Sequence, residues 1–304
     1  MIPGRQQGLR LFRLAGIEVF LHWSWFVVAV YEVQERTNQY RTPLWNVVEY
    51  LALFAIVTLH EFGHALACRQ VGGRADQIVL WPLGGVAYVN PPQRPGATLW
   101  SVAAGPLVNL VLMPPLLGLS VLAHTLGLSA AFPDASRFIG AVAFMNFGLF
   151  VFNVLPVYPL DGGQILRSLL WFPLGRARSL AAATLVGFVG TVGLFGLAIL
   201  WASPWTGLMA AFVGLNCWRG FQQSRILSRL AKMPRHLGFA CPSCRAAPPI
   251  GAFWSCAQCQ QPFDTFEGHG VCPHCGAAFA LTACADCGRR YSMSEWALTA
   301  PAPL

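Results

Sequence analysis

The sequence predicts an α-helical polytopic membrane protein with about six transmembrane helices, a membrane-associated β-hairpin and a small cysteine-rich domain at the C-terminus. Of the 304 residues, 55% are hydrophobic and only 11% are charged. So few charges cannot cover a soluble globule of this size. Long apolar runs fill the first 220 residues, and most of the cysteines lie after them. The chain therefore divides into a membrane part and a smaller cytosolic part.

The predicted spans are apolar runs close to the length that a hydrocarbon core of about 30 Å requires. They lie at residues 14–34, 47–69, 98–124, 137–157, 178–201 and 204–219. Basic residues precede the first run, and no small-residue cleavage site follows it, so we expect an uncleaved first span.

The orientation in the membrane follows from the basic residues. If the N-terminus is cytosolic, 17 Lys and Arg residues fall on the cytosolic side and three in the outer loops. This asymmetry predicts that both termini are cytosolic. The net charge of +8 then reflects topology and does not require a nucleic-acid partner.

The stretch "WPLGGVAYVNPPQRPG" (81–96) interrupts the helical pattern with Gly84, Gly85, Pro91 and Pro92. It is too apolar for an ordinary surface loop. We expect a hairpin that enters the bilayer, which is tolerated only where its backbone is buried in protein or lines a wet cavity.

The second apolar run contains "HEFGH", residues 60–64. On a helix His60 and His64 lie one turn apart on the same face, so they can share a zinc ion, and Glu61 lies beside them as a general base. The pattern alone is weak, and two ordinary polar residues near a helix end would also explain it.

The depth of this motif favours the metal site. Twelve mostly apolar positions precede His60 from Val48, and at about 1.5 Å each they place it about 18 Å from the outer face. A charged residue near the bilayer centre costs about 2.5 to 3.5 kcal/mol, which a purely structural helix would avoid.

A catalytic zinc site needs a third protein ligand. The candidate is Asp161 in "NVLPVYPLDGG" (153–163), where prolines and glycines should unwind the fourth span and expose polar groups to a wet pocket. An Asp helix cap at a cytosolic helix end is the alternative explanation of this residue.

The chain resembles the site-2 protease family of intramembrane zinc metalloproteases over about residues 10–220. Five segments carry the resemblance in the family's order: "GIEVFLHWSW", "TLHEFGHAL", "WPLGGVA", "AAGPLVNL" and "NVLPVYPLDGG". The resemblance implies that His60, His64 and Asp161 bind zinc and that Glu61 is the general base. It also implies a catalytic role for Asn109 in the active-site cavity, and helix packing is the alternative explanation of this residue.

The resemblance further implies hydrolysis of peptide bonds in or near transmembrane segments of other membrane proteins, with the active site on the cytosolic side of a bacterial cytoplasmic membrane. A substrate helix must unwind first, and the hairpin around Gly84 and Gly85 is expected to hold it extended by strand addition. The segment 124–136 has no room for a PDZ domain, as in the family's PDZ-lacking branch. A noncatalytic zinc-binding membrane scaffold or adaptor is the alternative, but it has no use for Glu61.

Eight of the ten cysteines form four C-x-x-C knuckles in a region that the topology places in the reducing cytosol. Disulfides are disfavoured there, so we predict a double zinc-ribbon domain with two structural four-cysteine zinc sites besides the catalytic zinc. The predicted ligands are Cys241, Cys244, Cys256, Cys259, Cys272, Cys275, Cys284 and Cys287.

The first two knuckles are separated by 11 residues and the last two by 8. These short spacers favour sequential pairing, in which the first two knuckles share one metal and the last two share the other. Nested pairing stays open. The remaining cysteines, Cys68 and Cys217, are expected to be packing residues in apolar spans. The lone interfacial His22 is left out of the site.

The domain organisation expected from these patterns has four parts: a metalloprotease core at 1–219, a basic amphipathic linker at 220–240, the double ribbon at 241–296 and a disordered tail at 297–304. The linker is either a helix on the anionic leaflet or a solvated segment. Between Cys241 and Cys287 the only Lys or Arg is Arg245, so we expect a protein partner for the ribbons and no nucleic acid.

Overall fold

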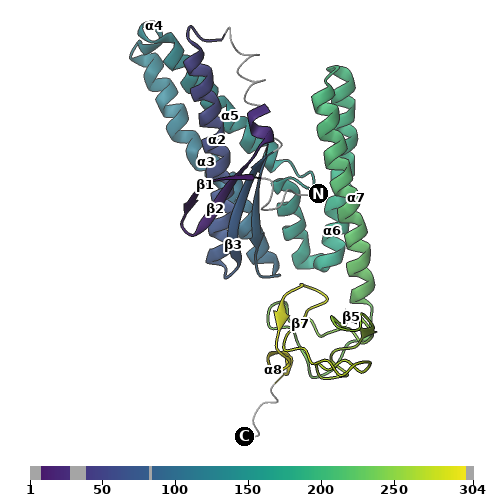
Figure 1. The fold of residues 1–304 in the computed structure, drawn as a ribbon. Helices are drawn as coiled ribbons and strands as arrows, with labels where there is room; N and C mark the ends of the chain where they lie inside the picture. Colours follow the sequence, from purple (N-terminus) through teal and green to yellow (C-terminus); the bar gives the residue numbers. More distant parts are fainter. Residues whose placement is uncertain (1–7, 28–38, 82–83, 299–304) are drawn as a thin grey trace.

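The computed structural model describes residues 8–27, 39–81 and 84–298. Long helices form one elongated body, and the C-terminal domain lies at one end of it, beneath a four-stranded sheet and the end of α7 (Figure 1). Four helices are long and apolar enough to cross a membrane: α2 (Pro43–Gln70), α3 (Pro95–Thr125), α5 (Pro133–Val154) and α6 (Asp161–Leu200). The fold class predicted from the sequence is confirmed.

The predicted first span, 14–34, is wrong over its first residues. Residues Gly8–Leu14 form strand β1, and Ile17–His22 form β2, joined by a two-residue turn. Ala15 and Gly16 both have positive φ, the conformation of a tight hairpin turn whose twist matches the flanking strands. A helix begins only after His22, and residues 28–38 of the predicted span lie outside the described residues.

The predicted hairpin is present and belongs to a larger sheet. Strand β3 (Arg74–Trp81) pairs antiparallel with β4 (Gly84–Asn90) and parallel with β2. The strand order is β1-β2-β3-β4, so β4 is an edge strand of this sheet.

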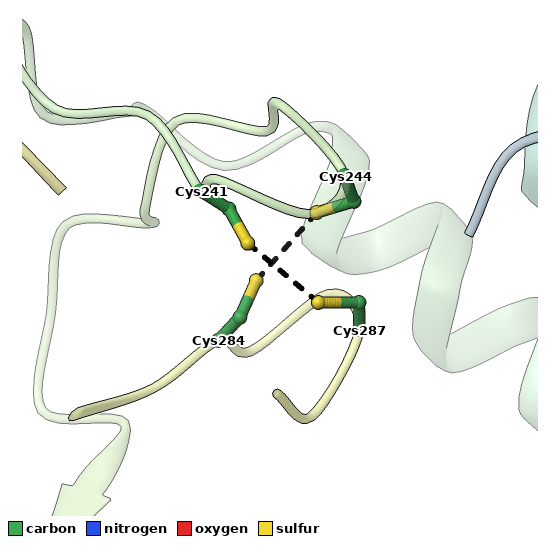
Figure 2. A group of neighbouring side chains, drawn as sticks. All are labelled: Cys241, Cys244, Cys284 and Cys287. Atoms are coloured by element: carbon green, nitrogen blue, oxygen red, sulfur yellow. Dashed lines mark hydrogen bonds between the residues drawn. The ribbon is translucent and has the colours of Figure 1, made fainter. Parts of the chain in front are cut away.

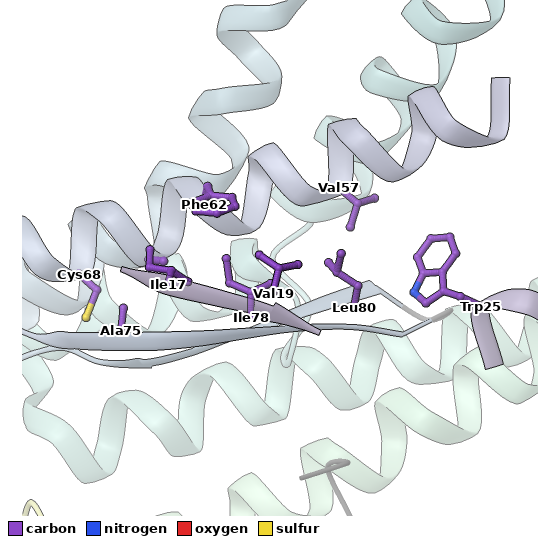
Figure 3. Close-up of a cluster of buried hydrophobic side chains, with 10 residues drawn as sticks. Ile17, Val19, Trp25, Val57, Phe62, Cys68, Ala75, Ile78 and Leu80 are labelled. Atoms are coloured by element: carbon purple, nitrogen blue, oxygen red, sulfur yellow. The ribbon is translucent and has the colours of Figure 1, made fainter. Parts of the chain in front are cut away.

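The sheet packs one face against α2. Side chains from β2, β3 and α2 interdigitate between the helix and the strands, among them Ile17, Val19, Phe62, Ile78 and Leu80 (Figure 3). This buried layer holds the hairpin of β3 and β4 at one position along α2, next to the helix turn that carries the two histidines.

The helix α5 ends at Val154, and α6 begins at Asp161, with an irregular segment between them as the prolines predicted. Gly162 and Gly163 allow the first turn of α6 to pack on this segment. A Cβ at Gly162 would lie 2.2 Å from the carbonyl oxygen of Val154, and one at Gly163 would lie 2.3 Å from the nitrogen of Tyr158.

Two further helices complete the membrane part. The short α4 (Leu128–Ala131) lies between α3 and α5, and α6 is broken at Gly175, whose φ is 76°. Helix α7 (Pro204–Ala231) runs without a break through the predicted sixth span and into the predicted linker. It is a helix over that span, although it is not one of the four apolar enough to count as membrane-spanning.

The C-terminal domain contains four two-residue strands and one short helix: β5 (Trp254–Ser255), β6 (Pro262–Phe263), β7 (Thr282–Ala283), β8 (Arg290–Tyr291) and α8 (Met293–Trp296). Its apolar core is small and aromatic. Phe266 packs edge-on against Phe239, Trp254 and Trp296, with ring centroids 5.2, 5.3 and 4.8 Å away.

Candidate metal centres and active site

His60 and His64 lie one turn apart on α2, and both are buried. Their Nε2 atoms are 3.1 Å apart, so both imidazoles present the same nitrogen to one point. The i, i+4 spacing of the sequence produces this convergence, as predicted.

Asp161, the first residue of α6, reaches the same point. Its Oδ2 lies 3.0 Å from Nε2 of His60 and 3.3 Å from Nε2 of His64. Ligands about 2.0 Å from a tetrahedral zinc ion are themselves about 3.3 Å apart. The three donor atoms therefore have the mutual distances that zinc requires, with the fourth corner left to water or substrate.

Gly105 of α3 makes room for this group. A Cβ at that position would lie 2.3 Å from Nε2 of His64 and 2.7 Å from Nε2 of His60. Any other residue would fill the space in which the imidazoles and a metal ion meet. The donor set and this cradle both fit a zinc ion.

Glu61 faces the hairpin strand β4. Its Oε2 accepts a hydrogen bond of 2.8 Å from the backbone N–H of Ala87. In the described part of the chain Oε1 accepts no hydrogen bond, so this oxygen is available for a proton. A Cβ at Gly85 would lie 2.2 Å from Cγ of Glu61, which is why the strand needs glycine where it crosses the carboxylate.

The predicted site residue Asn109 contacts a histidine directly. Its Oδ1 accepts a hydrogen bond of 2.5 Å from Nδ1 of His60, and its Nδ2 donates to Oδ1 of Asn146 at 2.9 Å. Asn146 in turn donates to the backbone oxygen of Asn109 at 2.9 Å, and both side chains are completely buried. These contacts fix the tautomer of His60 that leaves Nε2 free for a metal.

His64 is held in the same way by a backbone group, because its Nδ1 lies 2.9 Å from the oxygen of Ser101 on α3. The sequence interpretation missed both Ser101 and Asn146. The signal for Asn146 was available: a polar residue inside an apolar span is costly unless it has partners.

The cysteines gather in two groups, and the favoured sequential pairing is wrong. Cys241 and Cys244 meet Cys284 and Cys287 (Figure 2), while Cys256 and Cys259 meet Cys272 and Cys275. The pairing is nested: the inner two knuckles form one group and the outer two form the other. Aromatic packing accompanies this arrangement, because Phe266, between the second and third knuckles, lies in the same core as Cys241, Cys284 and Trp296.

Both groups have the dimensions of a four-cysteine zinc site. The four Sγ–Sγ contacts that cross between knuckles measure 3.6 to 3.8 Å. Thiolates about 2.3 Å from a tetrahedral zinc ion are about 3.8 Å apart. In the inner group the backbone N–H of Cys259 lowers the pKa of Cys256 to about 6, which favours the thiolate that a metal needs.

The arrangement of helices and donor groups agrees with comparisons to known proteins. The sequence profile of peptidase family M50 matches residues 48–133 and 119–197, which include all three histidine and aspartate donors. The chain belongs to peptidase family M50. It is an integral membrane protein.

Individual M50 relatives are similar over the same region. A zinc metalloprotease of Methanocaldococcus jannaschii is 30% identical over 181 residues, which are 59% of this chain and 50% of that protein. A putative zinc metalloprotease of Synechocystis is 27% identical over 241 residues, 73% of this chain and 62% of that protein. The match therefore spans between half and two thirds of the length of these relatives.

Among solved structures, the site-2 protease from Methanocaldococcus jannaschii superposes with a TM-score of 0.51 at 25% identity. The superposition covers 70% of this chain and 95% of that one. The match to the M50 family model ends at residue 197, so the cysteine domain lies outside it.

Proposed function

We propose that this M50 member is an intramembrane zinc metalloprotease that hydrolyses peptide bonds within or near transmembrane segments of other membrane proteins. The observation that supports it best is the convergence of His60, His64 and Asp161 beside Glu61. A purely structural metal site has no need for the carboxylate, so nothing favours the noncatalytic scaffold.

Zinc bound by His60, His64 and Asp161 would supply a Lewis acid that polarises the scissile carbonyl and lowers the pKa of water. Glu61 accepts a proton from the attacking water on its free oxygen and delivers it to the leaving amine. The Ala87 N–H holds the other oxygen in place, and Asn109 positions His60.

The substrate is a transmembrane helix that must be locally extended before cleavage. Strand β4 offers an edge next to Glu61, so an unwound segment can pair with it by strand addition. We place this site on the cytosolic side of a bacterial cytoplasmic membrane, with both termini cytosolic, as the distribution of basic residues favours. The two cysteine groups hold one structural zinc each, and the ribbon domain binds a protein partner.

Replacing Glu61 with Gln tests the proposal. We expect cleavage of membrane-protein substrates to fall by at least about a hundredfold, because proton transfer is lost while the three donors are untouched. The protein should still contain three zinc ions per chain. Candidate substrates are found by membrane proteomics, as single-span proteins that accumulate in cells producing the Glu61→Gln variant.

Asp161→Ala is the matched comparison. It removes a donor, so both cleavage and one zinc per chain should be lost. Full cleavage by a verified Glu61→Gln protein would refute the catalytic role, and an unchanged zinc content in Asp161→Ala would place the third ligand elsewhere.

A further inference from the structure

A cavity of about 380 Å³ lies where the ribbon domain meets the membrane helices. Each of three chain segments supplies part of its wall. The residues that matter are Gln93 and Arg94 before α3, Trp171 and Arg176 of α6, and Cys244 and Asp286 of the ribbon.

The cavity carries positive charge that the surrounding residues do not neutralise. Among the described residues Asp286 is the only acidic one in its wall, and its carboxylate accepts two contacts from Arg235, at 2.6 and 3.3 Å. Arg176 donates to the backbone oxygen of Asp286, and its Nε is buried and has no hydrogen-bond partner in the ranges that the structure describes. Among the described residues the Arg94 guanidinium makes no hydrogen bond or ion pair.

A third guanidinium lies close by. The guanidinium carbons of Arg167 and Arg176 are each 5.9 Å from the ring centroid of Trp171. The Nε of Arg167 is also buried without a hydrogen-bond partner in the described part of the chain. Arg94 and Arg176 therefore line a space in which the described residues offer them few acceptors, and Arg167 lies next to it across Trp171.

The position of the cavity places it at the surface of the membrane. Arg94 directly precedes the spanning helix α3, and Trp171 lies one turn before the break of α6 at Gly175. Tryptophan gathers where hydrocarbon gives way to headgroups, and basic pockets between helices at the cytosolic surface suit lipid headgroups.

We propose that this cavity binds an anionic phosphate group at the cytosolic boundary of the membrane. The guanidinium fork matches phosphate in shape and charge, and two such forks from different elements can hold one group between them. The source is either the headgroup of an anionic phospholipid or free phosphate. Because Asp286 and Cys244 form part of the wall, the ribbon must be docked for the site to be complete.

Native mass spectrometry of the purified full-length protein tests this site with phosphatidylglycerol as the probe. Wild type should retain one phosphatidylglycerol per chain in preference to phosphatidylcholine. Arg94→Gln should bind it at least about tenfold more weakly, because a charged donor is lost. The matched control is Arg229→Gln, an exposed basic residue near the cytosolic end of α7 that does not line the cavity.

Inorganic phosphate separates the two sources. If millimolar phosphate displaces the lipid from wild type, and Arg94→Gln weakens phosphate binding as well, the site takes a free anion. If the lipid stays bound, the headgroup is the ligand. Three results would overturn the proposal. Arg94→Gln could bind phosphatidylglycerol as tightly as wild type, or Arg94→Gln and Arg229→Gln could lose the same affinity for it. Wild type could also retain phosphatidylglycerol no better than phosphatidylcholine. Three zinc ions per chain in each variant verify that the ribbon is folded.

Discussion

His60 and His64 each use the ring nitrogen that faces away from the metal for a second contact. Nδ1 of His60 meets an amide side chain, and Nδ1 of His64 meets a backbone oxygen. Metal-bound imidazoles require such partners to hold one tautomer and one ring orientation. Here the partners come from α3, so the proposed metal site joins three helices through its donor residues and their supports.

Asn146 is the residue whose removal best tests this support. Asn146→Leu should weaken zinc binding at the active site by about 10- to 100-fold, because Asn109 loses the partner that orients its amide toward His60. The measurement is zinc retention against a graded chelator, with the ribbon zincs counted separately by their thiolate ligands in cobalt-substituted protein.

Asn216→Leu is the control for this substitution. Asn216 also lies in a helix of the membrane part, but it bonds only to the backbone oxygen of Phe212 among the described residues. Equal zinc affinities in Asn146→Leu and wild type would show that Asn109 orients itself without its neighbour.

The convergence of the three donor residues was predictable from the sequence, and their supports were predictable only in part. The spacing of His60 and His64 fixes their common face, and the proline and glycine context marks Asp161. Asn109 was identified through a family resemblance. The resemblance placed it in the active-site cavity but did not predict its hydrogen bond with His60. The backbone oxygen of Ser101 leaves no trace in the sequence, since every residue has one.

At the level of elements, the N-terminal strands were missed because apolar content alone was counted. The segment from Gly8 to His22 has short apolar stretches interrupted by Arg10, Arg13 and Glu18 on either side of Ala15 and Gly16, which fits two strands and a turn. The sheet also buries part of this segment against α2, so its apolar residues serve a protein interior where a lipid-facing span was expected.

The pairing of the cysteine knuckles could not be decided by spacer length. Closing the longer loop costs only on the order of 1 kcal/mol more by chain entropy. Both pairings form two four-cysteine zinc sites, so the zinc contribution is the same in each, and a modest difference in packing is enough to decide between them. The aromatic packing around Phe266 and Trp296 depends on contacts between residues 30 apart, and no local pattern encodes it.

Paired substitutions distinguish the two arrangements. With nested pairing, Cys244→Ser with Cys284→Ser removes two ligands from one site, so the protein should lose one zinc per chain. Cys244→Ser with Cys259→Ser damages both sites and should lose two. Elemental analysis of the full-length protein measures both values.

Sequential pairing gives the opposite result for these two double variants, so the outcome is decisive for the connectivity. The Glu61→Gln protein, which alters no metal ligand, supplies the reference value. Each lost zinc should also unfold its own part of the ribbon, because so small a domain buries too little apolar surface to fold unaided.

For the whole molecule, the proposed chemistry lies in the membrane part and the proposed recruitment in the ribbon. Deletion of residues 241–304 should therefore preserve cleavage of a generic unwound peptide and reduce cleavage of the natural substrate several-fold. The comparison is of cleavage rates for both substrates in reconstituted vesicles.

A shorter truncation that removes only residues 299–304 is the matched control, since it leaves every described residue of the ribbon in place. An unchanged rate on the natural substrate after the long deletion would argue against recruitment and leave the domain as a stability or localisation element.

The unbroken course of α7 has a mechanical consequence. The helix extends for 28 residues, about 42 Å, and Arg235 ties the chain just beyond its end to Asp286 of the ribbon and to the oxygen of Leu230. The ribbon is thus attached to the end of one long, unbroken helix. A protein that pulls on the ribbon would tilt this whole helix. Because Cys217 of α7 donates to the backbone oxygen of Tyr158, the force would reach the segment just before Asp161.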